Sequence, residues 1–178
     1  MKSMKEMMEL EFSRLVTFED INGGPVEKHI EAGAEERAAL AARLDIAAVD
    51  SLAAKVVLRR RMGSPLVEVV GQFAADVTQN CVVTGAPVAD HIEDVIDELY
   101  GPEDYEPDED AEGNEAFPEL FDAGGIDIGE MVTQLLTLSL NPAPQAAEAE
   151  IPRDAVASEA SDRRRPFADL GELLKKRS

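Results

Sequence analysis

Apolar and polar residues alternate through the stretch 65–88, and the rest of the chain can be understood as elements that cover it. One side of the pattern is mostly apolar and the other mostly polar: Val67, Val69, Phe73, Ala75 and Val77 against Glu68, Gln72, Asp76, Thr78 and Asn80. A period of two is typical of a strand with one buried face. Because the pattern is too long for one flat strand, we expect a bend or bulge at Gly71 or near Gln79.

The preceding segment, 52–62, alternates in the same way, with Leu52, Ala54, Val56 and Leu58 on one side. Gly63 and Ser64 follow it, and a two-residue loop with glycine first is typical of a type II′ hairpin. We therefore predict that 52–62 and 66–83 pair as one long antiparallel hairpin.

Two segments have the composition and end signals of helices. The segment 33–44 is rich in strong helix formers, and its acidic residues lie in the first turn, which suits the helix dipole. The segment 127–140 begins with Asp127 and Glu130, which predict a capping box, and then carries apolar residues at helical spacing. Shorter strands are expected at 12–18 and 26–30.

The segment 88–100 is ambiguous. Ile92, Val95, Ile96, Leu99 and Tyr100 have the spacing of a helix, whereas a position directly after a hairpin favours another strand.

An acidic run occupies residues 101–125, which contain no Lys or Arg. Such a run buries little apolar surface, so we expect a mobile loop. Asp108, Asp110, Glu112, Gly113 and Glu119 match the spacing of a calcium-binding loop. Two prolines, at 102 and 107, deny that loop its entering helix, so a solvated acidic loop is the favoured interpretation.

The composition is that of an acidic protein with an aliphatic core. The 178 residues have a formal net charge of −20, 44% are hydrophobic and only 4% are aromatic. We expect a single α+β domain at 1–141, a linker at 142–162, and a C-terminal segment, 163–178, that folds back or is flexible. No stretch is apolar enough for a signal peptide or a membrane span, which favours a cytoplasmic protein.

Few residues suggest chemistry. The single cysteine, Cys81, excludes an intrachain disulfide and a cysteine-based zinc site within one chain, and a buried structural role is its commoner fate. No phosphate-binding loop, serine elbow or aromatic RNA platform is present. We predict no catalytic residue, cofactor or metal.

Basic residues gather in clusters that we consider candidate contacts to RNA or a protein partner. These are Arg59, Arg60 and Arg61 at the hairpin tip, and Arg163, Arg164, Arg165, Lys175, Lys176 and Arg177 near the C-terminus. Internal pairing with the acidic loop is the alternative.

The order of these parts resembles the YceD family, the large ribosomal RNA subunit accumulation proteins, in the form found in alphaproteobacteria. The segments 69–84, 126–144 and 166–173 carry the resemblance. The motif residues are Gly71, Gln79, Cys81, Thr84 and Pro87. The resemblance implies that 88–100 is a strand, which we adopt. The family often has Cys-x-x-Cys where this chain has Cys81 and Thr84, so a metal role is not carried over.

The fold expected is α+β, with an antiparallel twisted sheet, a long central hairpin and two or three packed helices. The resemblance implies a non-catalytic ribosome-biogenesis factor that supports accumulation or processing of large-subunit ribosomal RNA, with a pre-ribosomal large-subunit particle or a basic ribosomal protein as its partner. One alternative is an acidic adaptor or chaperone for a basic ribosomal protein, since a charge of −20 attracts a basic client. Another is a metal-dependent hydrolase or nuclease, which would need carboxylates held on rigid elements.

Overall fold

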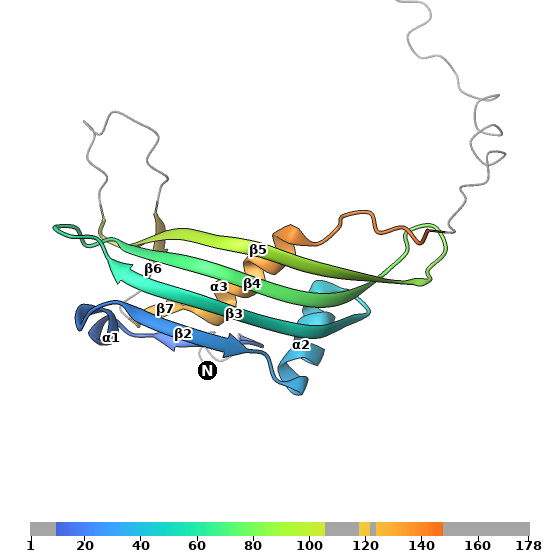
Figure 1. Cartoon of the computed structure of the whole chain (residues 1–178), viewed down its shortest axis with the longest axis horizontal. Helices are drawn as coiled ribbons and strands as arrows, with labels where there is room; N and C mark the ends of the chain where they lie inside the picture. Colours follow the sequence, from blue (N-terminus) through green and yellow to red (C-terminus); the bar gives the residue numbers. More distant parts are fainter. Residues whose placement is uncertain (1–9, 106–117, 122–123, 148–178) are drawn as a thin grey trace, which may run out of the picture. The chain divides into compact units, whose positions relative to one another are not determined.

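The computed structural model describes residues 10–105, 118–121 and 124–147. The chain divides into two units, Met1–Ala146 and Ala147–Ser178, and the elements below belong to the first (Figure 1). They follow in this order: β1 (Leu15–Val16), α1 (Phe18–Asn22), β2 (Val26–Glu31), α2 (Ala34–Leu44), β3 (Ala48–Arg60), β4 (Val67–Asn80), β5 (Pro87–Pro102), β6 (Glu119–Phe121), β7 (Ile126–Asp127) and α3 (Ile128–Ser139).

A five-stranded sheet in the order β2-β3-β4-β5-β6 forms the main layer, and β1 pairs with β7 in a separate two-stranded sheet. Neighbouring strands of the main sheet are antiparallel except for β5 and β6, which are parallel. The predicted α+β class is confirmed, and so is the long central hairpin, which is formed by β3 and β4.

Among the described residues, helices cover one face of the main sheet and leave the other face open. Figure 1 shows α2 and α3 on the same side, behind the strands. The fully buried side chains come from both layers: Leu52, Val56 and Leu58 of β3, Val67, Val69 and Val77 of β4, Leu40 of α2, and Ile128 and Leu136 of α3. Each large aliphatic side chain buried in this way contributes about 1.5–3 kcal/mol, so the aliphatic core holds the helices on this face.

β5 confirms the strand interpretation of 88–100, and the helical pattern was misleading there. Ile92, Ile96 and Tyr100 are buried because they lie on the covered face, and they are four residues apart. A spacing of four fits every second residue of one strand face as well as successive turns of a helix. Val95, which the helical pattern counted as apolar core, is 73% exposed on the open face.

The connection between β3 and β4 is longer than predicted. The last paired residues are Arg60 and Val67, the Arg61 N–H donates to the Leu66 carbonyl, and the loop therefore spans 62–65. Pro65 explains the difference, because it has no N–H to close a two-residue hairpin. The expected irregularity within 65–88 is also misplaced, since the register shift lies on β3 between Val49 and Ser51.

Two of the expected element ends differ in detail from the structure. Asp127 caps α3 by accepting hydrogen bonds from the N–H groups of Gly129 and Glu130, but the Glu130 side chain binds Arg43 instead of completing a capping box. The strand expected at 12–18 is only β1, because Thr17 caps the short helix α1.

The segment expected to be an acidic loop, 101–125, is partly regular structure. Its first residues end β5, and 119–121 form β6 beside them. Most of the calcium-loop match, including Asp108, Asp110 and Glu112, lies outside the described residues. Among the residues that are described, no helix is both long and apolar enough to cross a membrane.

Candidate functional site

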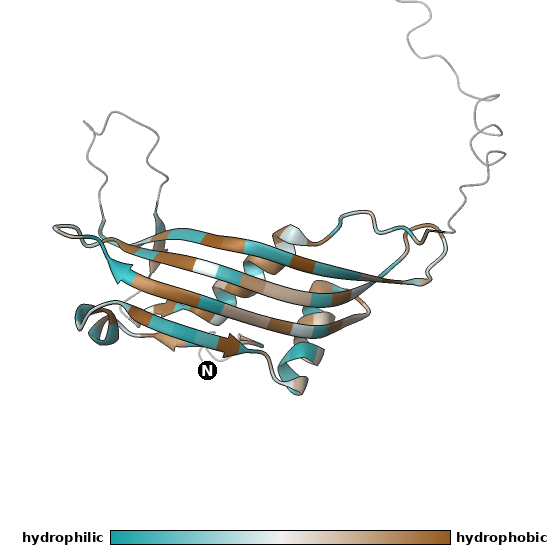
Figure 2. Cartoon of the chain, viewed as in Figure 1, coloured by the Kyte–Doolittle hydropathy of each residue, from teal (hydrophilic) through white to brown (hydrophobic). Residues whose placement is uncertain are grey.

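The open face of the main sheet is the candidate site. It consists of the outward side chains of four strands: Glu27, His29 and Glu31 of β2; Ala53, Lys55, Val57 and Arg59 of β3; Glu68, Val70, Gln72, Ala74 and Asp76 of β4; and His91, Glu93, Val95 and Asp97 of β5. Figure 2 shows hydrophilic and hydrophobic positions alternating along these strands. The polar half of that alternation lies on the open face.

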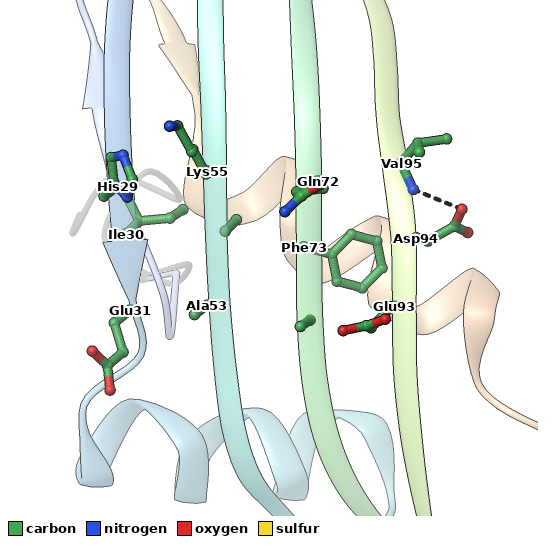
Figure 3. A pocket seen from close by; sticks show the side chains of 12 residues that line it. His29, Ile30, Glu31, Ala53, Lys55, Gln72, Phe73, Glu93, Asp94 and Val95 are labelled. Carbon is green, nitrogen blue, oxygen red and sulfur yellow. Dashed lines mark hydrogen bonds between the residues drawn. The ribbon is translucent and has the colours of Figure 1, made fainter.

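The strand register arranges these side chains in rows across the sheet. His29, Lys55, Gln72 and Val95 form one row, and the next runs through Ala53 and Ala74 (Figure 3). Because alanine side chains are short, the surface is hollowed here, and the hollow has a volume of about 610 Å³. Charged side chains surround this shallow hollow, and its floor is apolar.

Each basic side chain of the open face contacts a carboxylate of the same face. Lys55 Nζ lies 2.9 Å from Glu27 Oε1, and the same oxygen lies 3.2 Å from His29 Nε2. The hydrogen bond from Lys55 is the main reason that the pKa of Glu27 is lowered. Among the described residues, Glu31 and Asp97 have no such cationic partner. Among the described residues, the open face therefore has carboxylates without a cationic partner, whereas each of its cations contacts a carboxylate.

A serine, an aspartate and a histidine meet near the bulge of β3. Ser51 Oγ donates to Asp76 Oδ2 at 2.7 Å, and His91 Nδ1 lies 2.7 Å from Asp76 Oδ1. The Asp76 carboxylate, followed by Glu93, raises the pKa of His91. A nucleophilic serine needs its hydroxyl bonded to the imidazole, whereas here the carboxylate lies between the two. The cluster therefore favours the charged form of His91 and does not activate Ser51.

The three arginines at the hairpin tip have intramolecular partners. Arg59 Nε and Arg61 Nε each lie 2.7 Å from one oxygen of the Glu68 carboxylate. Arg60 donates to Asn22 Oδ1 at 3.0 Å and to the Ser64 carbonyl at 3.1 Å. The other predicted basic contacts, 163–165 and 175–177, lie outside the described residues, so their role as contacts stays a prediction.

The motif residues divide between the middle of β4 and the turn after it. A Cβ atom at Gly71 would lie 2.1 Å from the Lys55 carbonyl oxygen, so the close approach of β3 requires glycine. Thr84 belongs to the turn between β4 and β5, and Pro87 begins β5. Gln79 and Cys81 are both buried where the chain leaves β4.

The corner at the end of β4 receives the segment after α3. Gln79 Nε2 donates to the Asn141 carbonyl at 3.0 Å, while Gln79 Oε1 has no partner among the described residues. The Ala146 N–H donates to Cys81 Sγ at 3.4 Å. The Thr84 hydroxyl and this N–H lower the pKa of the Cys81 thiol to about 6. The first residues of the expected linker are therefore packed on the sheet.

Two features of the site were missed at the level of sequence. The carboxylates of the open face that lack a cationic partner can be recognised only when the polar positions of each strand are combined with the strand register. The attachment of 141–146 to the β4 end has no local signal in the sequence: Pro144 is buried there, and its carbonyl accepts a hydrogen bond from the Val82 N–H at 2.9 Å. Among the described residues, no group of three or more His, Cys, Asp or Glu side chains is arranged to hold a metal ion.

Comparisons with protein-family models, with curated proteins and with solved structures find no match to this chain.

Proposed function

We propose that the chain is a non-catalytic ribosome-biogenesis factor that supports accumulation or processing of large-subunit ribosomal RNA by holding a basic protein of the precursor particle. The observation that carries this proposal is the charge pattern of the open face. Its cations are already paired within the fold, whereas Glu31 and Asp97 have no cationic partner among the described residues.

Electrostatics favours a basic protein over RNA as the ligand of this face. Phosphate contacts supply most of the affinity of RNA-binding proteins, and carboxylates repel phosphate. The net charge of −20 acts in the same direction at longer range. The resemblance of 69–84 and 126–144 to the YceD family supplies the ribosomal context. It is also the basis for proposing a cytoplasmic location.

Affinity purification with and without RNase tests the proposal. We expect large-subunit ribosomal proteins to stay bound after RNase, and to be lost from the variant Glu31→Gln/Glu93→Gln/Asp97→Asn. The matched control, Glu35→Gln/Glu103→Gln/Asp104→Asn, removes the same charge from exposed positions off this face and should still retain them. Complete loss of the ribosomal proteins on RNase treatment would contradict a protein partner.

A depletion strain tests the biological half of the proposal. We expect mature large-subunit ribosomal RNA to fall relative to small-subunit RNA, and the triple variant to complement less well than its control. Unchanged subunit profiles at several growth temperatures would contradict the proposed role.

A further inference from the structure

The outer edge of β5 is open along most of its length. β5 spans Pro87–Pro102 and pairs with β4 from Pro87 to Tyr100. On its other side, β6 pairs only with 100–102. Within the part of the chain that the structure describes, no strand covers the outer edge from 88 to 99.

The backbone of this edge is available for pairing. Val95 N–H donates to Asp94 Oδ1 at 2.8 Å, so it points away from β4 (Figure 3). Because antiparallel pairs alternate in direction, the N–H and C=O groups of His91, Glu93 and Asp97 also point outward. An unpaired row of this kind is a template for another strand.

Carboxylates line both sides of the same edge. Glu93 and Asp97 lie on the open face, and Asp90, Asp94 and Glu98 alternate with them toward the covered face. Partial burial, followed by the charges of Glu119 and Asp97, raises the pKa of Glu98. Negative charge is therefore in excess at this edge, where the exposed Val95 side chain and His91, which contacts Asp76 and Glu93, also lie.

We propose that the outer edge of β5, from 89 to 98, binds an extended, Lys- or Arg-rich segment of a partner protein as an added strand. The outward N–H and C=O groups of β5 supply the hydrogen bonds, and the carboxylates toward the open and covered faces select a basic sequence. An added strand displaces Asp94 Oδ1 from the Val95 N–H and places an apolar side chain beside Val95. This inference rests on the proposed function, since it specifies how the basic partner is held.

The edge carboxylates have a second possible use, which is to keep two copies of the sheet from pairing edge to edge. The two uses make different predictions. An edge that is only protected binds no basic strand, and it self-associates when its carboxylates are neutralised to amides. An edge that is a binding site gains a strand when a basic peptide of suitable shape is added.

Two synthetic peptides of equal charge test the proposal on the full-length protein. The first is acetylated and amidated (Lys-Val)5, which can form a strand. The second is (Lys-Pro-Pro)5, in which proline removes most backbone donors. We expect only the first to slow amide hydrogen exchange at His91, Glu93, Val95 and Asp97 in NMR spectra. Equal binding of both peptides, or protection elsewhere on the sheet, would overturn the proposal.

Two variants sharpen this test. Val95→Pro removes one outward N–H without removing a bond to β4, and Val95→Ala keeps that N–H. We expect the proline variant to lose peptide binding and the alanine variant to keep it. Glu93→Lys/Asp97→Lys should weaken binding about tenfold or more, whereas Glu35→Lys/Glu103→Lys, with the same change in net charge, should weaken it only about twofold. Equal weakening by the two lysine pairs would contradict an edge site.

The peptide test and the ribosomal test can fail separately. If the edge binds (Lys-Val)5 but no ribosomal protein survives RNase, the edge site stands and the proposed function is wrong. If ribosomal proteins survive RNase and Glu93→Lys/Asp97→Lys retains them, the partner binds the chain elsewhere and the edge proposal is wrong.

Discussion

Arg43 in the last turn of α2 holds Glu130 in the first turn of α3 through two parallel hydrogen bonds, 2.8 Å from Nη1 to Oε2 and 2.6 Å from Nη2 to Oε1. Arg43 Nη1 also donates to Glu11 Oε2 at 3.0 Å. Both carboxylates raise the pKa of the guanidinium, with Glu130 the larger cause. The contact joins the two helices that cover the sheet, at positions that are far apart in the sequence.

Arg43→Met keeps the apolar stem and removes the guanidinium. We expect a loss of about 1 kcal/mol in the free energy of unfolding, because a bidentate pair is stronger than a simple surface pair but remains partly exposed. Glu130→Gln should cost a similar amount. The double variant should cost clearly less than the sum of the two single losses in thermal denaturation, and strict additivity would contradict the coupling.

Gly71→Ala should disrupt the central hairpin. The added Cβ atom would lie 2.1 Å from the Lys55 carbonyl and 2.9 Å from the Val56 Cα, so the backbone itself must move. We expect a loss of about 2–3 kcal/mol, at the upper end of overpacking substitutions. Gly23→Ala is the control, since its nearest neighbour lies at an ordinary 3.5 Å, and it should leave the melting temperature nearly unchanged.

The main elements could be predicted from sequence because their signals are local. Alternation along β3 and β4 requires only the side-chain period of a strand, and the composition of 34–44 and the Asp127 cap predict helices in the same way. β5 was ambiguous because Ile92 and Ile96 fit both periods. The polar residues of β5 favour a strand only when the pairing of β5 with β4 is known.

The candidate site was harder to predict because it depends on contacts between strands. Arg59 and Arg61 look like free positive charge in the sequence, yet the hairpin register brings Glu68 between them. Gln79 donates a hydrogen bond to the carbonyl of Asn141, which is 62 positions away in the sequence. Such pairs have no periodic signature, since they arise from how the elements fold back on one another.

Glu98→Gln should stabilise the protein near neutral pH. A carboxyl group whose pKa is raised by folding destabilises the fold when it is ionised, and this cost disappears as the pH falls through the raised pKa. We expect a melting temperature roughly 1–2 °C above that of the unmodified protein at pH 7, with the difference vanishing toward pH 4. Asp104→Asn, an exposed change of the same charge, is the control, and it should leave the melting temperature at pH 7 nearly unchanged. A lower melting temperature for Glu98→Gln at pH 7 would contradict the electrostatic argument.

The Cys81 thiol should ionise at an unusually low pH. The Thr84 hydroxyl is the main cause that lowers its pKa to about 6, and Thr84→Val should therefore raise the midpoint of the thiolate ultraviolet absorbance. Because the folded pKa is depressed, the contribution to stability is present above the ordinary thiol pKa of about 8.5 and is lost as the pH falls through about 6. Cys81→Ser should lack this pH dependence. A wild-type midpoint near the ordinary value would refute it.

The hairpin-tip arginines provide the last prediction. If they contact phosphate, replacing Arg59, Arg60 and Arg61 by alanine should weaken co-sedimentation with precursors of the large subunit. The melting temperature should change little, because exposed ion pairs contribute only about 0–1 kcal/mol each. Glu68→Gln is the matched variant, since it removes the carboxylate that both Arg59 and Arg61 contact while it keeps every arginine. We expect this variant to co-sediment at least as well as the unmodified protein, because a carboxylate that competes with phosphate for Arg59 and Arg61 is removed. If the triple variant instead melts much lower and co-sediments normally, the arginines serve the hairpin and not a ligand.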